Sequence, residues 1–197
     1  RSGADVTVGV HAVTREAAKG LGIMRLAPDG RVVGFVEKPN DSQVLDELEL
    51  NEVDLLPQDQ QEQNRRFLGS MGIYVFSREA LEKALTGTTE WDFGKHIIPS
   101  LLNQMCVMRY TFQGYWEDIG TIRSFYEANL RLTQPDSPFS FYAADAPIYT
   151  RPRYLAPTRI VNTRISDSLI ADGCLLEEGE ISNSILGIRS LVRRGSR

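Results

Sequence analysis

The sequence predicts an α/β domain over residues 1–134, an extended connector over residues 135–157 and the first coils of a parallel β-helix over residues 158–197. Three observations support this division. Strand-like runs alternate with helix-like segments in the first part, prolines are concentrated in the second, and a sixteen-residue repeat fills the third. Alternating strands and helices are typical of an α/β layer, and short repeats are typical of a solenoid.

Apolar, β-branched runs predict the strands of the first part. They are Val6–Val13, Gly22–Leu26, Val32–Glu37, Leu68–Phe76 and Val107–Phe112. The turn around Asp29 joins the second run to the third, which indicates a hairpin. Because strands and helices alternate along the chain, we expect a largely parallel sheet.

Short polar residues that can cap helices locate the helices. The expected helices are one early in Asp41–Arg66, followed by a long surface loop, then Arg78–Leu85 capped by Ser77, one capped by Asp92 that runs through Leu102, and one from Ile122 capped by Thr121. Five of the nine prolines then fall within residues 135–157 and exclude a helix there.

The last part repeats itself. The run ISDSLI at 165–170 recurs as ISNSIL at 181–186, and the same offset carries Leu175-Leu176 onto Leu191-Val192. The aliphatic residues expected to point inward are Ile165, Ile170, Leu176, Ile181, Leu186 and Val192. Because about three or more repeats are needed for a stable stack, we expect an unfinished solenoid, and a chain that starts at Arg1 is expected to be a fragment.

Composition excludes several classes of protein. A net charge of -4 does not favour nucleic-acid binding, and the basic cluster at Arg189–Arg197 is expected to be a solvated end. Cys106 and Cys174 are too far apart to suggest a zinc site and are expected to be small buried side chains in a reducing compartment. No apolar run is long enough for a membrane span and no signal peptide is evident, so we expect a cytoplasmic protein.

The tripeptide Glu37-Lys38-Pro39 is the first candidate site. Proline ends a strand, and the carboxyl ends of strands are where α/β sheets bind ligands. A lysine held there suits a phosphate group as a point charge, although an ordinary surface lysine would look the same.

The segment Gly114–Thr121 (GYWEDIGT) is the second candidate site. Asp118 can supply an oxygen ligand to Mg²⁺ and Trp116 can stack on a sugar. Alternatively, Asp118 caps the following helix and Trp116 fills the core.

Two further pairs of residues can be interpreted either as binding residues or as structural residues. Asp92 and Phe93 begin a DFG tripeptide, but no other kinase motif accompanies it, so a helix cap is the simpler interpretation. Ser70 and Tyr74 are four apart in one strand and point to the same face, where they can bind a sugar or bond to each other.

Seven segments occurring in order resemble the bacterial and plant ADP-glucose pyrophosphorylases, the glucose-1-phosphate adenylyltransferases. They are GLGIMRL, GFVEKP, SMGIYVF, DFGKHIIP, GYWEDIGTIRSFYEANL, FSFYAADAPIYTRPRYLAP and ISDSLIADGC. The resemblance spans Ala4 to Gly195. It implies a Rossmann-like nucleotidyltransferase domain, present in part, followed by a left-handed parallel β-helix.

The resemblance also implies roles for individual residues. Lys38 would bind the phosphate of glucose 1-phosphate and Asp118 would bind Mg²⁺. The residues implied to line the glucose pocket are Glu37, Ser70, Tyr74, Asp92, Phe93 and Trp116. The implied reaction is adenylyl transfer from ATP to glucose 1-phosphate, which releases pyrophosphate and serves glycogen or starch synthesis in an allosteric homotetramer.

One departure from the family is important. No glycine-rich phosphate loop occurs in this sequence, so we expect the chain to hold the glucose 1-phosphate half-site but not to turn over by itself. Two alternatives remain: a related sugar-1-phosphate nucleotidyltransferase that uses another nucleotide, and a non-catalytic regulatory subunit that binds sugar phosphate.

Overall fold

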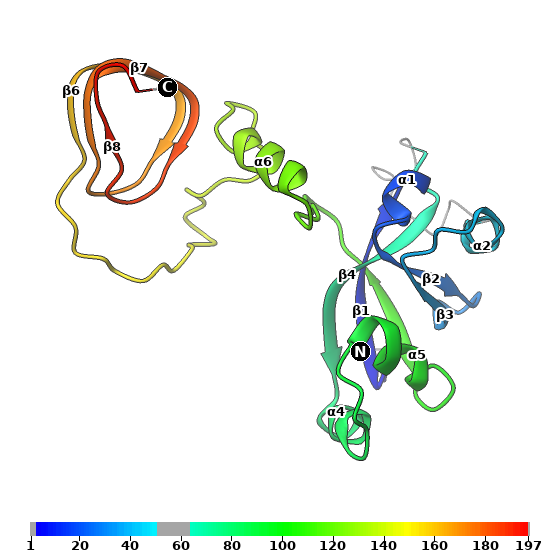
Figure 1. The fold of residues 1–197 in the computed structure, drawn as a ribbon. Coiled ribbons are helices and arrows are strands. Elements are labelled where there is room, and N and C mark those ends of the chain that lie inside the picture. Colours follow the sequence, from blue (N-terminus) through cyan, green and yellow to red (C-terminus); the bar gives the residue numbers. More distant parts are fainter. Residues whose placement is uncertain (1–2, 51–63, 197) are drawn as a thin grey trace. The chain divides into compact units, whose positions relative to one another are not determined.

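The computed structural model describes residues 3–50 and 64–196. Its contacts divide the chain into two compact units, Arg1–Gly114 and Tyr115–Arg197. Each unit is described by itself below, and Figure 1 shows the elements of both.

The first unit is built on a five-stranded sheet with the order β3-β2-β4-β1-β5. The strands are β1 (Val6–Val13), β2 (Gly22–Leu26), β3 (Val32–Glu37), β4 (Phe67–Phe76) and β5 (Val107–Thr111). The β2/β3 hairpin is present as expected. Among the described strands of this sheet, however, only β1 and β5 pair in parallel, whereas β1/β4, β2/β3 and β2/β4 are antiparallel.

The prediction of a largely parallel sheet is therefore wrong. Parallel neighbours need a crossover of roughly a dozen residues or more, and the turn between β2 and β3 is too short for one. Alternation along the chain also does not determine which strands become neighbours: β4 lies between β2 and β1, although it follows both in sequence.

The described helices include those expected at the caps Ser77, Asp92 and Thr121, and also a short helix over residues 15–18 that the sequence does not predict. They are α1 (Arg15–Ala18), α2 (Ser42–Leu48), α4 (Arg78–Leu85), the π-helical turn η2 (Phe93–Ile97) that leads into α5 (Ile98–Leu101), and α6 (Ile122–Arg131) in the second unit. Ser77 Oγ accepts a hydrogen bond from the Ala80 amide, and Asp92 Oδ1 accepts a hydrogen bond from the Lys95 amide. The surface loop expected after α2 lies largely outside the described residues. Of the helices that the structure describes, none is long and apolar enough to cross a membrane.

The core of the first unit lies mainly on one face of the sheet. Val6, Val8 and Val10 are fully buried on alternate positions of β1 and form one cluster with Ile98 and Leu101 of α5. Alternate residues of a strand point to the same face, so this packing fixes which side chains of the neighbouring strands face the helices. The helices α4 and α5 thus hold β4 and the η2 turn in place.

The second unit contains a coiled stack of β6 (Arg159–Ile170), β7 (Leu175–Leu186) and β8 (Leu191–Val192), which follow the same path in Figure 1. They pair in parallel with an offset of sixteen residues, as in Ile165 opposite Ile181. The predicted inward residues are confirmed, because Leu176 and Ile181 are buried together and Ile165, Ile170, Leu186 and Val192 pack against them.

The corners of the coil repeat with the same period. Asn162 and Glu178 have φ of 48° and 52°, and Asp167 and Asn183 have φ of 43° and 45°. Each pair is sixteen residues apart and adopts the left-handed backbone conformation, which Asn and Asp tolerate better than most side chains. The repeat in the sequence therefore corresponds to a repeat in backbone conformation as well as in packing.

Candidate functional site

A bulge in β4 brings two predicted site residues together. Across the β1/β4 pair, Tyr74 lies opposite Val8 and Ser70 opposite Val10, so the stretch of β4 is two residues longer than its partner. Gly72 lies between them with φ of 71°, a conformation that glycine adopts without strain, and its amide donates to Ser70 Oγ over 3.2 Å. The Ser70 and Tyr74 hydroxyl oxygens lie 3.5 Å apart across this bulge.

Tyr74 lies in a group of aromatic rings. Its ring stacks on Phe93 at a centroid distance of 5.8 Å and an angle of 18°, and Phe76 meets Phe93 edge-on at 6.0 Å. Burial raises the pKa of Tyr74, and the nearby carboxylates of Glu37 and Asp92 raise it further. Tyr74 is therefore a neutral phenol at physiological pH and can donate a hydrogen bond to a ligand.

Two carboxylates approach the same aromatic group. Glu37 ends β3, and its Oε2 lies against the backbone of Gly94, 2.8 Å from the position that a Cβ there would occupy. The Asp92 carboxylate accepts the Lys95 amide over 2.9 Å, and this hydrogen bond holds the pKa of Asp92 below its usual value. A carboxylate only accepts hydrogen bonds, so such a pair suits a ligand that is rich in hydroxyl groups.

Lys38 follows Glu37 in a left-handed conformation with φ of 49°. Its amide donates to the Leu21 carbonyl over 3.0 Å, its side chain is exposed and the next residue, Pro39, is buried. A non-glycine residue pays about 1–2 kcal/mol for this conformation, so the surrounding contacts must hold it there. The ammonium group thus projects from a fixed point at the carboxyl end of β3.

The remaining predicted site residues, Trp116 and Asp118, belong to the second unit. Trp116 is half-buried and Asp118 is exposed. The Asp118 carboxylate lies over Gly120, with Oδ2 3.0 Å from the position of a Cβ at that glycine. Thr121 caps α6 by accepting the Ser124 amide over 3.0 Å, so the alternative in which Asp118 caps this helix is wrong.

The described part of the chain offers few ligands for a metal ion. The described residues contain no group of three or more His, Cys, Asp or Glu side chains that could hold an ion. Glu117, next to Asp118, accepts the Tyr115 hydroxyl over 2.6 Å. Mg²⁺ is commonly held by one or two carboxylates together with substrate phosphates and water. Asp118 fits the role of one such carboxylate for an ion that arrives with phosphates, and the described residues do not form a complete metal site.

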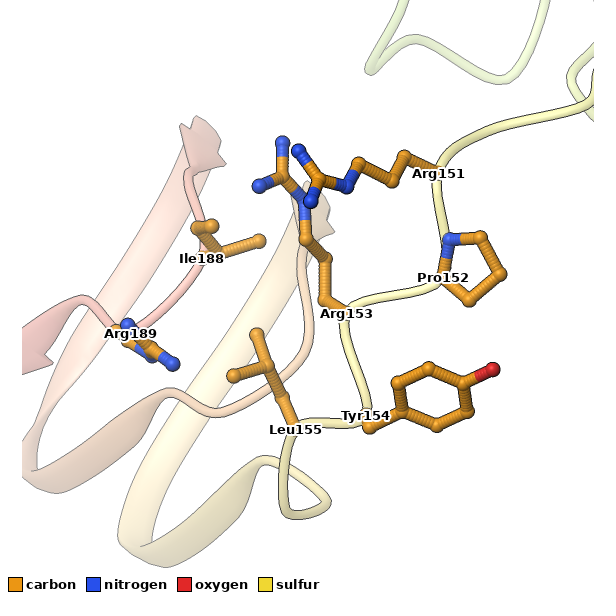
Figure 2. Close-up of a pocket in the computed structure, with 7 residues that line it drawn as sticks. All are labelled: Arg151, Pro152, Arg153, Tyr154, Leu155, Ile188 and Arg189. Carbon is orange, nitrogen blue, oxygen red and sulfur yellow. The ribbon is translucent and has the colours of Figure 1, made fainter.

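A separate hollow of about 490 Å³ lies in the second unit, where the connector meets a corner of the coil. Its lining residues are Arg151, Pro152, Arg153, Tyr154, Leu155, Ile188 and Arg189. In Figure 2 the Arg151 and Arg153 side chains extend toward the same region, near Ile188. Leu155 lies beside Gly173, with its Cβ 3.4 Å from the position that a Cβ at this glycine would occupy.

Sequence reasoning missed this hollow and the bulge. Arg189 is exposed, as expected of a solvated end, and it also lines the hollow with two arginines of the connector. Arg153 and Arg189 are far apart in the sequence, so no local sequence pattern indicates that they line the same hollow. The bulge had a signal, since Gly72 interrupts an otherwise apolar strand, and such a glycine often marks a bulge.

This chain belongs to the nucleotidyl transferase family, whose model matches residues 1–135. Residues 153–197 match the model of the GLGC left-handed parallel beta-helix domain. The two domains in this order form the architecture of the glucose-1-phosphate adenylyltransferases. The predicted fold class is confirmed, including the left hand of the coil.

Proposed function

We propose that this chain binds glucose 1-phosphate as the acceptor for adenylyl transfer from ATP, a reaction that yields ADP-glucose and pyrophosphate for glycogen or starch synthesis. The observation that supports this proposal is the convergence of Glu37, Ser70, Tyr74, Asp92 and Phe93 at the end of β3, next to Lys38. Carboxylates that accept hydrogen bonds, a neutral phenol that donates one and an aromatic surface are suited to binding a sugar ring. A fixed ammonium group is suited to binding the phosphate of the sugar.

In the proposed reaction, a phosphate oxygen of glucose 1-phosphate attacks the α-phosphorus of ATP. The bond from that phosphorus to the bridging oxygen breaks, and pyrophosphate leaves with the electron pair. Phosphoryl chemistry of this kind depends on in-line placement and charge neutralisation more than on covalent catalysis. Lys38 offsets the charge of the sugar phosphate, and the hydroxyl and carboxylate groups orient the sugar.

Mg²⁺ would neutralise nucleotide phosphates beside Asp118. The role proposed for Trp116 is stacking on the sugar. We also propose that the active protein is a cytoplasmic homotetramer.

A reconstitution experiment tests the proposal. The chain is co-expressed with the nucleotide-loop half of a bacterial glucose-1-phosphate adenylyltransferase, and pyrophosphate release is measured with glucose 1-phosphate and ATP, UTP, GTP or dTTP. We expect release with ATP only, its loss in Asp118→Asn, and no release by the chain alone. Release with another nucleotide would favour a related nucleotidyltransferase. Sugar-phosphate binding without release in any mixture would favour the regulatory subunit.

The arginine-lined hollow supports a proposal about regulation. Arg151, Arg153 and Arg189 place three positive charges around one hollow, and guanidinium groups bind phosphates and carboxylates in a bidentate manner. We propose that an anionic effector binds there. Arg153→Ala is expected to remove the response of the reconstituted enzyme to phosphorylated effectors while its activity without an effector is retained.

A further inference from the structure

Two glycines that are distant in sequence enclose the same carboxylate oxygen. A Cβ at Gly22, the first residue of β2, would stand 2.8 Å from Glu37 Oε2. A Cβ at Gly94, in the η2 turn, would stand 2.8 Å from the same atom and 3.3 Å from Glu37 Cδ. Both oxygen distances are shorter than any that real Cβ atoms show. In its present position the Glu37 carboxylate therefore leaves no room for a side chain at Gly22 or Gly94.

Two further side chains, Phe35 and Asp92, lie beside the same two glycines. Gly22 lies opposite Glu37 in the β2/β3 pair, and the Phe35 ring covers Gly22, with Cζ 2.4 Å from the position of its Cβ. The Asp92 carboxylate lies 3.6 Å from the Cβ position of Gly94. Glu37 is half-buried, and close contacts on its buried side leave its side chain fewer rotamers than a fully exposed one has. Glu37 is thus held against Gly94 and pointed toward the Asp92–Tyr74 side of the site.

We propose that Gly22 and Gly94 are positioning residues that fix the Glu37 carboxylate for a hydroxyl group of the sugar. The inference rests on the proposed binding of glucose 1-phosphate. Because a carboxylate accepts but does not donate, its fixed position selects a sugar with a free hydroxyl there and disfavours a deoxy sugar, which would leave the carboxylate unpaired.

Gly94 gives the cleaner test of the two. Its φ is outside the left-handed region, so alanine is compatible with the backbone. Alanine is also the better helix former, and Gly94 lies within a helical turn, so local propensity alone predicts that Gly94→Ala stabilises the fold. Contact with Glu37 predicts the opposite. At Gly22 the overlap with Phe35 would obscure the effect of Glu37.

The first measurement is a stability cycle that needs no ligand. We expect Gly94→Ala to lower the melting temperature of the chain in the wild-type background and to leave it unchanged or raise it in a Glu37→Ala background. This reversal would show that the added methyl group acts on the Glu37 side chain. An equal decrease in both backgrounds would overturn the proposal, because the methyl group would then clash with something else.

The second measurement is a binding cycle with glucose 1-phosphate by calorimetry. Overpacking of this kind typically has an effect equivalent to about tenfold in a binding constant, and we expect Gly94→Ala to weaken binding by about that factor. In a Glu37→Asp background, whose shorter side chain withdraws from Gly94, the same substitution should have little effect. An unchanged factor in the two backgrounds would contradict a positioning role.

Gly20→Ala is the matched control. Its Cβ would meet only the Ala17 carbonyl at 3.6 Å, an ordinary contact, so binding should be unchanged. If the wild-type chain does not bind glucose 1-phosphate at all, the proposed function fails. The stability cycle still decides whether Gly94 positions Glu37, so the two failures are distinguishable.

Discussion

The coil of the second unit and the sheet of the first use their sequences differently. In the coil, each inward residue is repeated sixteen positions later, and the strands pair with that same offset. In the sheet, β4 lies between β2 and β1, and the candidate site takes residues from the end of β3, from β4 and from the η2 turn. The coil is thus specified by a local repeat, and the site is specified by contacts between distant segments.

This difference determines what each region tolerates. The coil contains a small core of Cys174, Leu176 and Ile181, with little neighbouring structure to compensate for a loss. The sheet has two larger clusters, and the residues of the candidate site are placed by exceptions to regular structure, such as Gly72 in the bulge and Lys38 in a left-handed conformation. Substitutions in the coil should therefore affect stability, and substitutions in the site should affect binding.

The largest effect is expected from Leu176→Ala. Leu176 is fully buried in the coil, and a leucine-to-alanine change in a core costs about 2–5 kcal/mol. In calorimetry we expect the transition of the coil to move to lower temperature while that of the sheet is unchanged. Leu191→Ala, at a residue that is 52% exposed in the same coil, serves as the control and should have little effect. Equal shifts of both transitions would refute the separation of the two units.

A smaller effect is expected at a corner of the coil. Asn162 is exposed with φ of 48°, so Asn162→Val should destabilise the coil by about 1–2 kcal/mol, because a β-branched residue is strained there. Asn162→Gly should be neutral or slightly stabilising. Thermal unfolding of the two variants checks this, and equal stabilities would mean that the corner conformation does not constrain the sequence.

The smallest effect is in the site and depends on pH. Because the pKa of Tyr74 is raised, mainly by burial, the unfolded state loses its phenol proton first as the pH rises above about 10. The contribution of Tyr74 to stability is therefore present below that pH and is lost as the pH rises through the folded-state pKa. Tyr74→Phe should reduce the loss of stability in this alkaline range. The same loss in both proteins would indicate that Tyr74 ionises normally.

The sequence allowed the coil to be predicted almost residue by residue. Its inward positions and strand offset were correct because the pattern of side chains and the pairing have the same period. The helix caps Ser77, Asp92 and Thr121 were also correct, since a cap and the amide it binds are only three residues apart.

The site could be predicted as a set of residues but not as an arrangement. The segment motifs pointed to Glu37, Tyr74 and Asp92, yet strand order depends on distant pairings that alternation along the chain does not encode. The enclosure of Glu37 by two glycines seventy-two positions apart was likewise invisible in the sequence. The roles of these residues in binding remain predictions.

Calorimetric titration of the chain with glucose 1-phosphate tests the central claim most directly. We expect saturable binding, and a loss of about 10–100-fold in affinity for Lys38→Ala, as is typical when a charged hydrogen-bonding partner is removed. Lys83→Ala, in the last turn of α4, should bind like the wild type. Absence of binding, or equal affinity in Lys38→Ala, would contradict the assignment of this site to a sugar phosphate.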